Sequence, residues 1–152
     1  MNKLFTACVI AWTVLVVFVM MDISKEFALA DIHKLEDSVL DATNRVRREH
    51  GLPILIKDVM LAENAKKYAI VNASKGFISH NHEPLVSRMP NNCTSIGENL
   101  YQGRDSTGDD IVNAWMRSQA HRENILDMEW ERIGVGIART GSQIIVVQLF
   151  CR

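Results

Sequence analysis

Two histidines and one glutamate stand in short motifs whose side chains can bind a metal ion or transfer a proton. His80 ends the tetrapeptide FISH, Glu98 is the centre of GEN, and His121 is the centre of AHR. Each motif lies beside a glycine or at the end of a predicted element, where side chains point away from the core. Taken singly, each residue is more often a packed or solvated side chain than a ligand. The chemistry therefore depends on whether the fold brings the three together.

Apolar residues at helical spacing predict two helices before the first of these motifs. Residues 31–50 have one apolar face, with Asp31 as the N-cap and Gly51 as the stop. A second helix is expected from an N-cap at Asp58 to Gly76. Three arginines close the first helix, where they suit its dipole, and we expect them on a solvated face. These are Arg45, Arg47 and Arg48.

The second half of the chain predicts a small sheet with a third helix. Residues 77–92 are expected to form a loop, followed by a short strand at 96–101. A helix is expected at 110–118, capped by Asp109, and then a tight segment at 121–124 that presents the second histidine.

A hairpin of residues 132–139 and 143–151 closes the chain. In its first strand, apolar residues alternate with Gly134 and Gly136, so another element or a ligand can approach the backbone closely. In its second strand both faces are apolar, which indicates cover on both sides. One face has Ile144 and Val146, and the other has Ile145, Val147 and Leu149. Together the elements predict an α/β fold, a three-layer α/β/α sandwich around a small, mainly antiparallel central sheet.

The composition is that of one globular domain. The chain has 152 residues, of which 47% are apolar and 23% charged, and its formal net charge is −1. This length is enough for a sizeable core. Because there is no basic excess, we expect no nucleic-acid partner.

The N-terminal segment has the three parts of a secretory signal peptide. Lys3 precedes an uncharged apolar run, Leu4–Met21, and residues 28–30 match an A-x-A cleavage site. Cleavage would remove residues 1–30 and export residues 31–152. The alternative is an uncleaved anchor, favoured by the length of the apolar run and by the charges that follow it. We expect a secreted protein, with a periplasmic or membrane-anchored form as the alternative and membrane contact only through an uncleaved segment.

Cysteine usage agrees with export. Cys8 lies in the predicted leader, which leaves Cys93 and Cys151 as a pair. In an oxidising compartment these two can form a disulfide that ties the chain end to a central loop, worth about 4 kcal/mol in the chain-entropy estimate. The alternative is two buried free thiols. We favour the disulfide because Cys151 is next to the chain end.

Several motifs, in this order, resemble the CAP superfamily of cysteine-rich secretory, antigen 5 and pathogenesis-related proteins, whose domain is also called SCP. The similarity is greatest to the short prokaryotic-type members and covers about residues 34–150. The matching segments are the first-helix ending at 44–53, GENL at 97–100, Trp115, HRENIL at 121–126 and IGVGI at 133–137.

This resemblance implies an α/β/α sandwich with a central cleft, lined in many members by two histidines and two acids that hold zinc or another divalent ion in some of them. His80 and His121 match the two histidines, and Glu98 matches the first acid. The second acid has no counterpart, since the nearby Glu123 does not match the motif. Two imidazoles and a carboxylate with one open position suit Zn²⁺. We therefore expect His80, Glu98 and His121 as metal ligands and, if the protein is an enzyme, as its catalytic residues.

Neighbouring residues have simpler interpretations. His82 could join a His-x-His site, but we expect it in the exposed loop. Asn99 and Asn124 suit a structural role, because their amides can satisfy loop backbone groups. Trp115 and Trp130 are expected to pack in the core or at its edge.

Three functions remain open from sequence. The first, which we favour, is a secreted or envelope-facing binding module, non-enzymatic, with a cleft for a divalent ion and a groove for a lipid, a peptide or another cell-envelope ligand. The second is a metal-assisted hydrolase, a protease or an envelope-processing enzyme. The third is a structural domain held at an envelope by its N-terminal segment.

Overall fold

The structure is a computed structural model that describes residues 3–152, with side chains described from Trp12 onward. The chain divides into two units, Met1–Lys34 and Leu35–Arg152. Helix α1 spans Lys3–Glu49, so Asp31 lies inside a helix and the expected N-cap there is wrong. The residues before Asp31 include neither glycine nor proline, and nothing in their backbone chemistry forces the helix to start at that point.

The first unit exposes large apolar side chains. Trp12 and Phe27 are each 70% exposed, and Phe18 is 62% exposed. Among the described residues, no helix combines the length and the apolar character that crossing a membrane requires. The predicted leader, residues 1–30, begins with two residues that the structure does not describe, and the side chain of Cys8 is not described either. Cleavage after Ala30 stays a prediction.

The second unit is built on a four-stranded sheet in the order β1-β3-β4-β2. Strands β2, β4 and β3 are antiparallel, whereas β1 joins β3 in parallel, so the sheet is mixed although mainly antiparallel. The expected α/β architecture is confirmed. The strands are β1 Ile56–Lys57, β2 Ile96–Arg104, β3 Arg132–Thr140 and β4 Gln143–Cys151.

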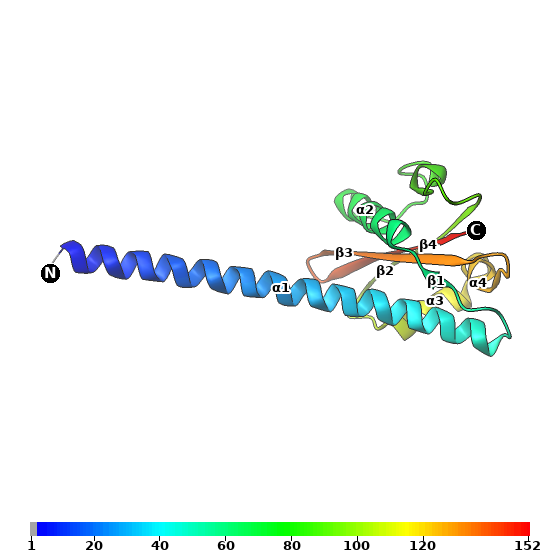
Figure 1. Ribbon diagram of the computed structural model, residues 1–152, viewed down its shortest axis with the longest axis horizontal. Coiled ribbons are helices and arrows are strands. Elements are labelled where there is room, and N and C mark those ends of the chain that lie inside the picture. Colours follow the sequence, from blue (N-terminus) through cyan, green and yellow to red (C-terminus); the bar gives the residue numbers. More distant parts are fainter. Residues whose placement is uncertain (1–2) are drawn as a thin grey trace. The chain divides into compact units, whose positions relative to one another are not determined.

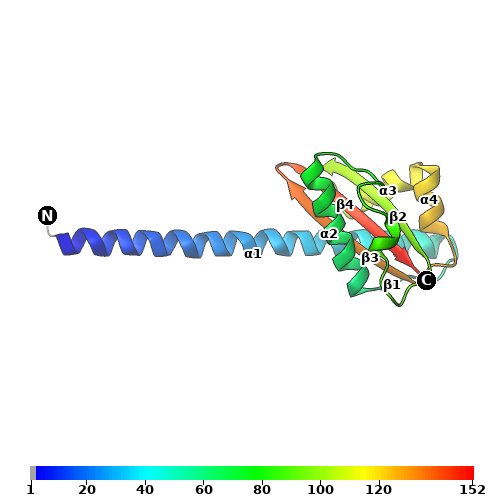
Figure 2. The same cartoon turned by 90° about the horizontal axis from the view of Figure 1, so that it is seen from above.

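Helices cover both faces of this sheet and complete three layers. Helix α2, Val59–Lys75, lies across β3 and β4 on one face (Figure 2). The C-terminal part of α1, with α3 (Gly108–Arg117) and α4 (Gln119–Leu126), lies on the other (Figure 1). The loop between α2 and β2 includes a single 3₁₀ turn, η1, at Leu85–Arg88.

Local sequence signals explain where α2 begins and ends. Asp58 is its N-cap and accepts a hydrogen bond from the backbone of Leu61, and Gly76 ends it in the left-handed conformation with φ of 79°. For α3 the N-cap is Thr107 in a capping box with Asp110, so the expected cap at Asp109 is wrong. The motif around His121, expected as a tight segment, is helical and belongs to α4.

The glycines of β3 allow α2 to approach the sheet closely. A Cβ at Gly136 would lie 2.0 Å from the backbone nitrogen of Lys66, and one at Gly134 would lie 2.3 Å from that of Ala62. The sequence predicted that either another element or a ligand would approach the backbone of β3 at these glycines. In the structure, helix α2 lies there. Alternation in β4 follows the expected pattern, since Ile145, Val147 and Leu149 join the core beneath α2.

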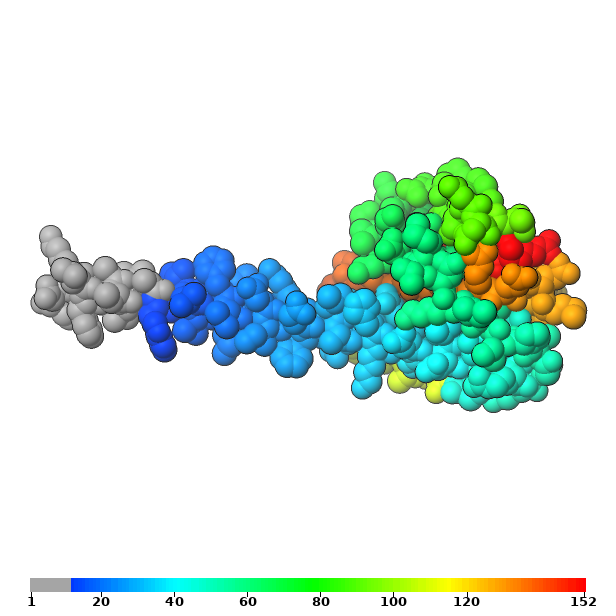
Figure 3. Space-filling view, viewed as in Figure 1, coloured from blue at the N-terminus to red at the C-terminus, as the bar shows by residue number. Residues whose placement is uncertain are grey.

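A disulfide and a buried arginine join distant segments of the second unit. A disulfide joins Cys93 and Cys151, whose Cα atoms are 5.7 Å apart. Figure 3 shows the loop segment (green) meeting the C-terminal residues (red) at the surface. Arg47 is fully buried and donates to the backbone oxygens of Pro53, Ile125 and Asp127. The expectation of a solvated Arg47 is therefore wrong, because its buried guanidinium donates hydrogen bonds to three carbonyl oxygens of the protein.

Replacing Gly136 with alanine should destabilise the domain. The new methyl group would meet the backbone of α2, which cannot move as a side chain can, so we expect a loss of about 1–3 kcal/mol in the free energy of unfolding. Urea denaturation of Gly136→Ala, with Thr140→Ala at the exposed end of the same strand as control, measures this. Equal stability of the two variants would contradict the packing described here.

The ionised carboxylate of Asp58 should make the stability of the domain depend on pH. Burial alone would raise the pKa of Asp58, but hydrogen bonds from Leu61 and Arg132 and the charge of Arg132 outweigh burial and lower it below 3.8. A carboxylate with a lowered folded pKa contributes stability above its unfolded pKa and loses it as pH falls through the folded value. We expect Asp58→Asn to cost about 1 kcal/mol at pH 7 and progressively less below about pH 4. Urea denaturation of both proteins at pH 7 and pH 3 tests this, and a constant difference would contradict it.

Candidate functional site

The carboxylate of Glu98 lies at the centre of the candidate site. Strand β2 is an edge of the sheet, and it pairs Glu98 with Leu149 of β4. The side chain of Glu98 is only 1% exposed. A buried carboxylate needs hydrogen bonds or a countercharge to stay ionised. The contacts of this side chain therefore determine what the site can do.

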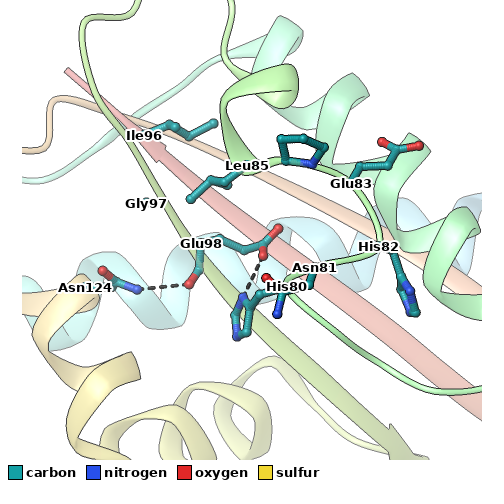
Figure 4. Close-up of a pocket in the computed structure, with 10 residues that line it drawn as sticks. His80, Asn81, His82, Glu83, Leu85, Ile96, Gly97, Glu98 and Asn124 are labelled. Atoms are coloured by element: carbon teal, nitrogen blue, oxygen red, sulfur yellow. Dashed lines mark hydrogen bonds and ion pairs between the residues drawn. The ribbon is translucent and has the colours of Figure 1, made fainter.

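One partner of Glu98 is His80, from the loop after α2. Its Nδ1 lies 2.7 Å from Oε1 of Glu98, and its ring is 53% exposed. Figure 4 shows the imidazole directed at the carboxylate. Because an ionised carboxylate only accepts hydrogen bonds, Nδ1 carries the proton, and Nε2 remains for a ligand.

The other partner of Glu98 is Arg88, at the end of η1, a residue that the sequence analysis did not single out. Its side chain is 3% exposed, and its Nη1 donates to Oε2 of Glu98. Its Nη2 donates to the backbone oxygen of His80 at 3.1 Å and to that of Glu83 at 2.5 Å. The guanidinium also lies over the ring of Tyr68, with Cζ 3.2 Å from the ring centroid. Arg88 thus joins the carboxylate, the His80 loop and α2.

His121 reaches the same end of β2 from helix α4. Its ring centroid is 6.3 Å from that of His80. Burial and, secondarily, the nearby His80 lower the pKa of His121, so its neutral form is favoured. The structure therefore brings His80 and Glu98 into direct contact and places His121 near them.

A network of amide side chains holds α4 against β2. Asn124 donates to the backbone oxygen of Glu98 and to Oδ1 of Asn99, both at 2.9 Å. Asn99 donates to the backbone oxygen of His121 and to Gln148, whose own amide reaches Thr43 of α1. Asn99 and Asn124 have the structural role expected from sequence, and they position the backbone of both Glu98 and His121.

Trp115 and Trp130 are packing residues, as expected. Trp115 is 1% exposed and donates from its indole to the backbone oxygen of Leu100. Trp130 stacks on Phe150, and its ring lies against Gly97, where an added Cβ would be 2.8 Å from Cζ2. The glycine of the GEN motif is thus required by the close approach of Trp130 to β2.

A zinc ion held by His80, Glu98 and His121 does not fit the arrangement of these residues. Both oxygens of Glu98 are engaged, one by His80 and one by Arg88. Among the described residues, no group of three or more His, Cys, Asp or Glu side chains is placed to hold a metal ion. Glu123 does not complete a set, because its carboxylate accepts from Gln119 on the exposed part of α4.

Beside this cluster lies an open cleft of about 640 Å³. Its polar lining includes His80, Asn81 and Asn124, and its apolar lining includes Leu85 and Ile96 (Figure 4). The remaining lining residues are His82, Glu83, Pro84, Gly97 and Glu98. The cleft thus combines hydrogen-bonding groups with an apolar wall, which suits a ligand of mixed character.

His82 lies in the loop after α2, as expected, and also borders the cleft. It is half-buried, lines the cleft, packs edge-on against Phe77 and lies 3.1 Å from the backbone oxygen of that residue. Arg88 was missed because a single arginine after a predicted loop has no periodic or motif context. Its pairing with Glu98 arises only from the path of the loop.

Replacing Asn99 with alanine should loosen the site from the side of α4. The substitution leaves the buried amide of Gln148 and the backbone oxygen of His121 without their partner, so we expect a loss of about 1–3 kcal/mol in unfolding free energy. We also expect the ring resonances of His121 to shift in NMR spectra. The control is Asn113→Ala on the exposed side of α3, and an Asn99 variant that behaves like it would contradict the network.

The chain is similar in sequence to known proteins. The sequence model of the family described as CAP, Cysteine-rich secretory protein family, matches residues 40–150. The chain is 29% identical over 121 residues to the "Uncharacterized protein YkwD" of Bacillus subtilis (strain 168), an alignment that covers 76% of this chain and 47% of that protein. The chain therefore spans about half the length of this relative.

Two solved structures are similar in fold. One is an extracellular protein containing a SCP domain from Bacillus anthracis str. Ames, with 26% identity and a TM-score of 0.69, covering 77% of this chain and 40% of that one. The other is an outer surface protein from Borrelia burgdorferi, with 25% identity and a TM-score of 0.67, covering 74% of this chain and 88% of that one.

Proposed function

The chain belongs to the cysteine-rich secretory protein (CAP) family, and we propose that it is a secreted or envelope-facing, non-enzymatic module that binds a lipid or another apolar envelope ligand in its cleft. The observation that carries this proposal is the cleft of about 640 Å³ with one apolar wall and one polar end. Leu85 and Ile96 would contact the apolar part of the ligand. His80 and Asn81 would hydrogen-bond its polar part.

Three observations support a location outside the cytoplasmic membrane. The sequence begins with the features of a signal peptide or an anchor. The Cys93–Cys151 disulfide is of a kind that persists in oxidising compartments. Two proteins of similar fold are described as an extracellular protein and an outer surface protein. A peptide could occupy the same cleft, but the apolar wall favours a lipid chain.

The hydrolase alternative has weaker support. Metal-assisted hydrolysis needs Glu98 or a comparable group at the ion or at the attacking water. Both carboxylate oxygens of Glu98 already have hydrogen-bond partners, His80 and Arg88. The hydroxyl of Ser79, which is next to His80 in the chain, accepts a hydrogen bond from the backbone N–H of Asn81. We therefore propose binding rather than turnover.

Titration of the full chain with cis-parinaric acid, a fluorescent fatty acid, tests the proposal. We expect saturable binding that Leu85→Asp weakens by about ten-fold or more, because the substitution puts a charge on the apolar wall. The matched control is Val86→Asp, since Val86 is 64% exposed and lies outside the cleft lining. Absence of saturable binding, or equal affinity of the two variants, would overturn the lipid assignment.

A further inference from the structure

We propose that the guanidinium of Arg88 is a built-in cation that takes the place of a divalent metal ion at Glu98. It follows that Glu98 positions His80 through a hydrogen bond and is not a metal ligand. It also follows that removing the guanidinium of Arg88 would allow a metal ion to bind at Glu98. This inference does not depend on which ligand fills the cleft.

The first argument is the charge balance around Glu98. Its buried carboxylate meets the equally buried guanidinium of Arg88 at Oε2 and the ring of His80 at Oε1. One positive charge therefore already compensates the one negative charge. A divalent ion at the same carboxylate would lie beside a guanidinium that is always charged, and in a poorly solvated place this repulsion is strong.

The second argument is that Arg88 joins the two segments that an ion shared by His80 and Glu98 would join. From one side chain it contacts β2 through Glu98 and the His80 loop through two backbone oxygens. A metal ion would join the same two segments through side-chain ligands. The forked guanidinium can make these contacts together because its donors point in several fixed directions.

The third argument is that Arg88 is held in place and cannot easily swing away. It lies over Tyr68, whose hydroxyl is fixed by a hydrogen bond of 2.7 Å to the backbone oxygen of Ser79. The backbone oxygen of Arg88 accepts a hydrogen bond from the side chain of Asn64 of α2 at 3.0 Å.

The Nε of Arg88 is buried and makes no hydrogen bond within the described part of the chain. A buried donor left unmatched is a cost that the contacts at Nη1 and Nη2 must outweigh.

Calorimetric titration of the full chain with Zn²⁺ tests the proposal. The wild type should show no binding that depends on Glu98, whereas Arg88→Met should bind Zn²⁺ at least about ten-fold more tightly, and addition of His80→Ala should remove the gain. The control is Arg104→Met, which removes an exposed arginine at the end of β2 and should bind as the wild type does. Tight wild-type binding that Arg88→Met does not improve would overturn the proposal.

A second measurement covers the case in which Arg88→Met does not fold, as judged by circular dichroism. In NMR spectra of the wild type, the side-chain carboxyl carbon of Glu98 should keep its position as Zn²⁺ is added. A saturable shift of this carbon would overturn the proposal. No lipid is present in either experiment, so failure of the lipid assignment and failure of this inference are distinguishable.

Discussion

A buried carboxylate that must stay compensated organises this domain. Glu98 lies at an edge of the sheet with almost no access to water, so its charge has to be balanced by protein groups. Arg88 supplies the countercharge and His80 the second hydrogen bond. Both come from the loop after α2, which has little regular structure of its own. The contacts that compensate the buried carboxylate of Glu98 therefore help to fix the position of that loop and of one wall of the cleft.

The edge position of β2 explains how residues distant in sequence meet. An edge strand leaves one side free of strand neighbours, and here the His80 loop and α4 both reach β2. The amide network through Asn99, Asn124 and Gln148 connects that region to α1, through the layer opposite α2. The cleft is thus formed between supports that come from both outer layers of the sandwich.

Features that depend on local sequence were largely predictable. The cap at Asp58, the stop at Gly76 and the alternation along β3 and β4 follow from short-range chemistry, and the structure has them. The family motifs pointed to the histidines and to Glu98. The amide chemistry of Asn99 and Asn124 was likewise reason enough to expect structural residues at these positions.

Features that depend on tertiary contacts were not predictable from local patterns. Arg47 has the sequence context of a surface arginine, yet three backbone carbonyls bring it into the interior. Arg88 likewise has no motif, and its role appears only when the loop is folded onto β2. Because the balance of charge at Glu98 depends on Arg88, the sequence alone could identify the two histidines and Glu98 but not the electrostatic character of the site.

The most direct test of this account is a crystal structure of the full chain grown with Zn²⁺, with anomalous diffraction recorded at the zinc absorption edge. We predict that Oε2 of Glu98 stays paired with Arg88 and Oε1 with His80, and that no anomalous peak lies within coordination distance of Glu98. A zinc peak bonded to Glu98, with Arg88 turned out of the site, would contradict the account.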